Sequence, residues 1–121
     1  MAKGRIAEGL AHWRKVLQKS PDNPRLLSDT AWVLATSRED AVRNGNEAVE
    51  IAEHAVQLTG ERDATALATL AAAYAETGEF AKAIDADQRA IQLAAQQGKS
   101  PMAEAFRARL ARFQANRPLR K

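Results

Sequence analysis

An internal repeat of about 34 residues limits the folds open to this chain of 121 residues. One short apolar step, Val16-Leu17, returns at intervals of 39 and 35 residues. This pair matches Ala55-Val56 and then Ala90-Ile91. A second pattern recurs after forty residues: Leu27, Ala31 and Leu34 match Leu67, Ala71 and Tyr74. A unit of this length holds one pair of helices, which buries its apolar face only when further units stack on it. The second unit carries five extra residues between its helices.

Proline and glycine residues divide the repeats into six predicted helices. Asn23 caps the second helix, and Pro24 stands in its first turn, where the missing amide costs nothing. Gly60 ends the third helix, and Ser100-Pro101 opens the sixth. We predict helices up to residue 20, over 24–36, from about 47 to 59, from a cap at Asp63 to residue 77, over 80–96 and over 100–116, with a polar loop over 37–46.

The composition favours an all-α fold. Hydrophobic residues make up 45% of the chain, but aromatic residues reach only 5% and alanine supplies much of the rest. Alanine is the best helix former, and its small side chain allows helices to approach closely. At this length we expect one domain of tightly stacked helices.

The third unit carries the most specific pattern in the sequence. Its first helix contains a leucine, a small residue and a tyrosine, and a turn glycine, an aromatic residue and two alanines follow. These are Leu67, Ala71, Tyr74, Gly78, Phe80, Ala83 and Ala90. This segment resembles the tetratricopeptide repeat (TPR) family. It departs from the family at Asp87, where an aromatic residue is usual, and at Ala95, where proline is frequent.

The resemblance extends over almost the whole chain. The middle stretch, over 31–49, is similar to the C-terminal repeats of large bacterial multi-repeat TPR proteins, and the closing stretch, over 109–118, is similar to their ending. The resemblance implies a right-handed α-solenoid of antiparallel helix pairs, with about six helices in one domain over 1–121. The divisions are a half repeat over 1–23, a repeat with an extended inter-helix loop over 24–60, a repeat over 61–97, and a capping helix with a tail over 98–121. The cap presents Met102, Phe106, Leu110 and Phe113 on one stripe.

Family resemblance also implies a ligand-binding groove lined by the first helix of each pair. The residues it assigns are Arg25, Ser28, Asp29, Trp32, Thr36, Thr65, Ala68, Thr69, Ala72, Ala75, Glu76 and Arg107. Trp32 is the anchor we expect, because tryptophan supplies a large apolar area, although burial beneath the 37–46 loop is an equal alternative. The lysines and asparagines of the family's carboxylate clamps are absent at these positions. The clamp function is therefore not expected for this chain. The function that the resemblance implies is a protein-interaction scaffold for a peptide or helix.

Two further modes of association remain open. The first helix carries an apolar stripe that a preceding helix normally covers in the family, so a homodimer through Ile6, Leu10, Trp13 and Leu17 is an alternative. Residues 101–121 hold six basic and one acidic side chain, so the tail from Arg107 to Lys121 is a second candidate, for anions. Phe106 and Phe113 are needed for the core, so nucleic acid is not the favoured partner.

No pattern for catalysis, a metal or a cofactor is present. His12 and His54 lie on different predicted helices without a second ligand at helical spacing, and no phosphate loop or nucleophile motif occurs. We therefore expect no enzyme activity. Cysteine is absent and no apolar run is long enough for a membrane span, which leaves the compartment open, with the cytoplasm as default and a bacterial periplasm compatible.

Overall fold

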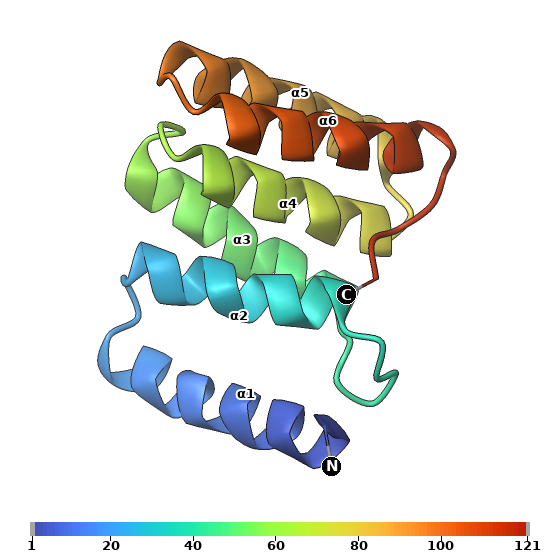
Figure 1. The fold of residues 1–121 in the computed structure, drawn as a ribbon. Helices are drawn as coiled ribbons and strands as arrows, with labels where there is room; N and C mark the ends of the chain where they lie inside the picture. The colour runs from blue at the N-terminus through green and yellow to red at the C-terminus, as the bar shows by residue number, and fades with distance from the viewer. Residues whose placement is uncertain (1, 121) are drawn as a thin grey trace.

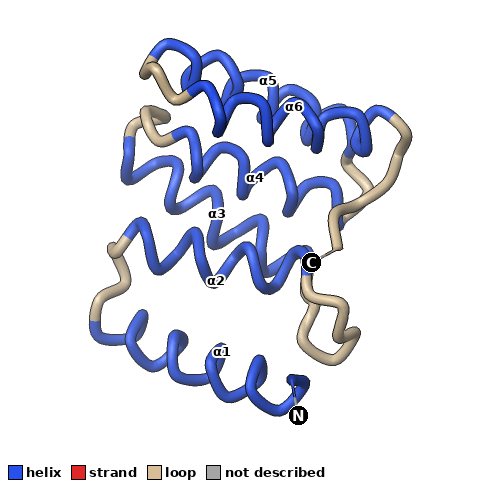
Figure 2. The backbone as a smooth tube through the Cα atoms, in the orientation of Figure 1, coloured by secondary structure: helices blue, strands red, loops and turns tan. Residues whose placement is uncertain are grey.

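The computed structural model describes residues 2–120, and this part of the chain forms six α-helices without a strand. The helices are α1 (Ala2–Lys19), α2 (Pro24–Thr36), α3 (Gly45–Thr59), α4 (Ala64–Glu76), α5 (Phe80–Gln96) and α6 (Ser100–Gln114) (Figure 2). The predicted all-α class is confirmed. Met1 and Lys121, the two ends of the predicted domain, lie outside the described residues.

The helices stack in chain order, with α1 at one end and the α5/α6 pair at the other (Figure 1). α2 packs against α3 and α4, α4 packs against α3 and α5, and α5 packs against α6. α1 packs chiefly against α2, and less closely than the other neighbours pack against each other. Short turns join consecutive helices, except between α2 and α3, where the loop is longer.

Local side-chain chemistry sets the N-terminal ends of α2, α3 and α4. Asn23 caps α2 by accepting a hydrogen bond from the Leu26 amide at 3.1 Å, and Asp63 caps α4 through the amides of Thr65 and Ala66. Both caps were predicted. α3 starts two residues earlier than expected, because the Asn44 side chain accepts from the Glu47 amide at 3.1 Å. α6 begins at Ser100 itself, preceded by Lys99, so Ser100 is not its cap.

Alanine dominates the helix contacts. Most alanines of α4 are fully buried, and they let α2, α3 and α5 approach its backbone closely. The largest fully buried apolar side chains are Phe113, Leu34 and Leu67, one from each of α6, α2 and α4. Leu58 is the one large apolar side chain with a clearly exposed surface in the region for which burial is known.

The segment after α6 turns back along the molecule toward the loop between α2 and α3 (Figure 1). Leu119 is buried, and Arg120 pairs with Glu76 at the end of α4, with Nη1 and Oε1 2.6 Å apart. Glu76 also accepts from Arg43 of the loop at 3.1 Å. One carboxylate therefore joins the loop, α4 and the C-terminal segment.

Two glycines give opposite predictions when replaced by alanine. A Cβ at Gly45 would lie 2.8 Å from Cγ of Glu76, which Arg43 and Arg120 hold in place, whereas a Cβ at Gly9 meets nothing within 4 Å. We expect Gly45→Ala to lower the free energy of unfolding by about 1–3 kcal/mol through overpacking. Gly9→Ala, inside α1, should raise it by about 0.5–1 kcal/mol. Urea unfolding followed by circular dichroism measures both, and equal stability of the two variants would contradict the prediction.

Candidate functional site

A groove of about 370 Å³ lies between α2 and α6, above α4. We call it the α2–α6 groove. Its lining residues are Ser28, Asp29 and Trp32 from α2, Thr65, Ala68 and Thr69 from α4, and Met102, Ala105, Phe106 and Arg109 from α6. The floor consists of small side chains because α4 is rich in alanine and threonine, and the larger side chains stand on the two walls.

Trp32 is half-buried and forms part of the α2 wall. Its ring lies beneath the guanidinium of Arg109, with 4.7 Å between the Arg109 Cζ atom and the ring centroid. The same guanidinium lies 5.4 Å from the ring of Phe106. A cation at these distances from aromatic faces is attracted by their quadrupoles. Trp32 is therefore a wall of the groove and contacts the opposite wall through Arg109.

Asp87 is a buried carboxyl group that interacts electrostatically with Arg109 of the α6 wall. It belongs to α5, which packs against α4 and α6, and it is fully buried without a hydrogen bond to either carboxylate oxygen. Burial raises its pKa from 3.8 to about 7, and the positive charge of Arg109 opposes this rise. Burial in turn lowers the pKa of Arg109, against the attraction of Asp87. The two groups stabilise one another electrostatically without a direct hydrogen bond.

The structure brings together half of the residues assigned to a groove by family resemblance. Six of them line the α2–α6 groove: Ser28, Asp29, Trp32, Thr65, Ala68 and Thr69. Arg25 lines an adjoining hollow with Ser28, Asp29, Asp63 and Thr65. The remaining five lie elsewhere: Thr36, Ala72 and Ala75 are buried, Glu76 is held by two arginines, and Arg107 pairs with Glu104 on the same helix.

The α6 wall was not among the residues that the sequence assigned to the groove. Met102, Ala105, Phe106 and Arg109 form this wall. A usable signal was present, because residues three and four apart share a helix face, and Phe106 stands four residues after Met102 and three before Arg109. The sequence pattern predicts only a core role for the stripe that contains Met102 and Phe106. Phe106 does both, since it is buried and also contacts Arg109.

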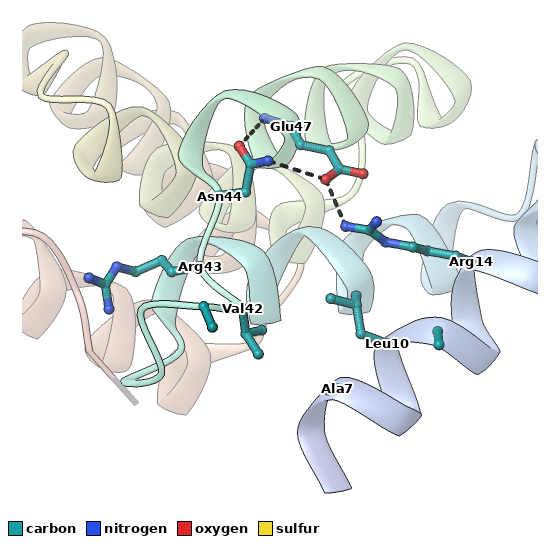
Figure 3. A pocket seen from close by; sticks show the side chains of 9 residues that line it. Ala7, Leu10, Arg14, Val42, Arg43, Asn44 and Glu47 are labelled. Carbon is teal, nitrogen blue, oxygen red and sulfur yellow. Dashed lines mark hydrogen bonds and ion pairs between the residues drawn. The ribbon is translucent and has the colours of Figure 1, made fainter. Parts of the chain in front are cut away.

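The four residues predicted for self-association lie on α1 and are mostly covered. Leu10 is buried, and Ile6, Trp13 and Leu17 are half-buried. A second hollow runs beside α1, where Leu10 faces Val42 of the α2–α3 loop and Arg14 reaches Glu47 of α3 at 2.7 Å (Figure 3). The hollow is lined by Ala7, Leu10, Ala11, Arg14, Ala41, Val42, Arg43, Asn44 and Glu47. Among the four residues, Leu10 alone reaches it.

The basic C-terminal segment is partly engaged within the molecule. Arg107 pairs with Glu104, and Arg120 pairs with Glu76. Arg112 and Arg117 are exposed. The two histidines also lie at the surface, where His12 is exposed and His54 lies 2.9 Å from Asp22.

Within residues 2–120, no three acidic or histidine side chains gather in an arrangement able to hold a metal ion. The helices of this part are all too short or too polar to cross a membrane. No model of a known protein family matches the chain, and no curated protein matches it either.

Proposed function

We propose that this chain is a TPR-type solenoid that acts as a protein-interaction scaffold and holds a peptide or helix in the α2–α6 groove. The observation that carries the proposal is the groove itself, lined by three helices that are not consecutive in the chain and containing a half-buried tryptophan. Such a groove suits a chain segment lying across several repeats. The repeat pattern of the sequence supports the solenoid assignment.

The chemistry of the groove supports a peptide or helix as the ligand. Ala68 and Thr69 leave space on the floor for ligand side chains, and Trp32 and Phe106 offer apolar area on the walls. Large aromatic side chains in partly enclosed pockets often carry most of the binding free energy at an interface. A catalytic role has no comparable support, because the sequence holds no nucleophile motif.

The two other modes of association have weaker support. The apolar stripe of α1 offers a partner little exposed area, since Leu10 is buried and its three companions are half-buried. In the basic segment, Arg120 is neutralised by Glu76 and Leu119 is part of the core. The α2–α6 groove combines open space, an aromatic wall and an accessible cation.

Replacing Trp32 with alanine is expected to weaken peptide binding by about 2 kcal/mol, or roughly thirtyfold, the scale of an aromatic hot spot. The ligands are peptides selected from a displayed random library on the wild-type protein, and affinity is measured by fluorescence anisotropy. In a Trp13→Phe background, Trp32 is the one remaining tryptophan, and its emission should change on binding.

Trp13→Ala is the matched control, because Trp13 lies on α1 away from the groove. It should bind the selected peptides as the wild type does. Unchanged affinity of Trp32→Ala for every selected peptide would remove the α2–α6 groove as the binding site.

A further inference from the structure

The chain leaves α6 in a direction that local chemistry fixes. Asn116 has a left-handed backbone, with φ 58°, which asparagine tolerates better than most residues. Its amide donates to the Phe113 carbonyl at 3.0 Å, and the Arg117 amide donates to the Arg112 carbonyl at 2.9 Å. This pair of hydrogen bonds ends a helix and turns the chain back, and Pro118 prevents the helix from continuing. We call residues 116–120 the C-terminal strap.

The C-terminal strap crosses one end of the helix stack, from α6 past the end of α4 toward the loop between α2 and α3 (Figure 1). Two adjacent side chains hold it there. Leu119 is buried, and Nη1 of Arg120 lies 2.6 Å from Oε1 of Glu76. Glu76 is fixed in turn by Arg43 of the loop, at 3.1 Å. A buried aliphatic side chain and a partly buried ion pair therefore attach a segment that has no helix of its own.

The strap reaches the part of α2 and α4 into which the α2–α6 groove would continue. On α2, Thr36 stands four residues after Trp32, and on α4, Ala72 and Glu76 stand four and eight residues after Ala68. Residues at this spacing share a helix face. Trp32 and Ala68 line the open groove, whereas Thr36 and Ala72 have no exposed surface and Glu76 bonds to the strap. The open part of this face therefore ends on the side where the strap crosses.

We infer that the C-terminal strap is an internal competitor of the ligand: it covers the C-terminal ends of α2 and α4 and shortens the surface on which a peptide can lie. This inference rests on the proposed function and adds its regulation. A peptide that extends along α4 beyond Ala68 has to displace Leu119 and Arg120. The apparent affinity for such a peptide falls by the fraction of molecules in which the strap is open. Segments held by few buried contacts open without unfolding the rest of the domain.

The cover is tested first without any ligand. The sequence contains no cysteine, so a single introduced cysteine reports on the exposure of one position. Ala72→Cys should react slowly with a maleimide when the strap is intact. Leu119→Ala or Arg120→Gln should accelerate this reaction about tenfold, since the rate follows the population of open molecules. Ala71→Cys, which is fully buried on a different face of α4, should stay slow in every background.

Competition is measured with peptides selected from a displayed library on the double variant Leu119→Ala/Arg120→Gln. We expect these peptides to bind the wild type about tenfold more weakly than the double variant, and to bind Arg120→Gln with an intermediate affinity. Arg117→Gln is the matched control, because Arg117 is exposed on the strap and the variant loses the same charge; it should bind as the wild type does. Thermal unfolding of each variant establishes that it is folded, and Arg120→Gln replaces the double variant if that variant is not.

Three results would overturn the inference and leave the proposed function standing. Equally slow labelling of Ala72→Cys in the wild type and in both strap variants would show that the helices themselves cover this face. Equal acceleration of Ala71→Cys would show a general loosening of the fold. Equal affinity of the selected peptides for the wild type and the double variant would show that the strap does not compete. If no peptide is selected on either protein, the proposed function fails and the inference fails with it.

Discussion

Replacing Asp87 with asparagine is expected to raise the free energy of unfolding by about 4 kcal/mol at pH 8 and to change it little at pH 4. Asp87 is fully buried, and neither of its oxygens has a hydrogen bond. Its pKa rises from 3.8 to about 7 on folding, chiefly because burial disfavours the charged form. Each pH unit between these two values costs the wild type about 1.4 kcal/mol.

The direction follows from proton binding. Between about pH 4 and pH 7 the folded protein holds the proton of Asp87 and the unfolded chain releases it. The wild type is therefore most stable below about pH 4 with respect to this group, and it loses stability as the pH rises toward 7. Asparagine cannot ionise, so the variant does not suffer this loss.

Unfolding by guanidinium chloride at pH 4, 5.5 and 8 measures the free energy of unfolding of the wild type and of Asp87→Asn. Asp85→Asn is the matched control, since Asp85 is exposed on the same helix, and it should change stability little at any of the three pH values. Parallel stability curves for the wild type and Asp87→Asn across this range would contradict the prediction. Such a result would mean that Asp87 is already ionised and satisfied in the folded protein.

Phe113→Ala is expected to lower the free energy of unfolding by about 3–5 kcal/mol, because it removes a fully buried ring and leaves a cavity. Phe113 lies in the last turn of α6 and has no exposed surface. The loss should appear in the global transition if α6 folds together with the rest of the chain. Urea unfolding by circular dichroism, together with hydrogen exchange of the α4 and α6 amides, measures it.

Leu58→Ala serves as its control. Leu58 is 40% exposed at the end of α3, so its truncation should change stability by about 0.5–1 kcal/mol at most. A cost below 1 kcal/mol for Phe113→Ala, or a loss of protection confined to α6, would show that α6 is not part of the cooperative core.

Short-range chemistry determined much of the fold. Asn23, Asp63 and Gly60 mark helix ends by interactions with amides a few residues away or by a left-handed backbone, and these signals do not depend on the tertiary structure. The alanine content and the helical spacing of apolar residues then specified an all-α chain. The start of α3 differed by two residues, because both Asn44 and Asn46 are polar and the amide contact of Asn44 decides between them.

The contents of the groove depended on the tertiary structure. Trp32 and Arg109 are 77 residues apart in the sequence, and Glu76 meets Arg43 and Arg120 from two different segments. Helical spacing predicted which residues share a face of α2, α4 or α6, and half of the assigned groove residues line the groove. It did not predict which face meets which neighbour, or how far apart α2 and α6 lie across α4. Those distances are set by the packing of all the side chains between the helices. The distances in turn determine whether an arginine is paired, as Arg120 is, or has free donors, as Arg109 has.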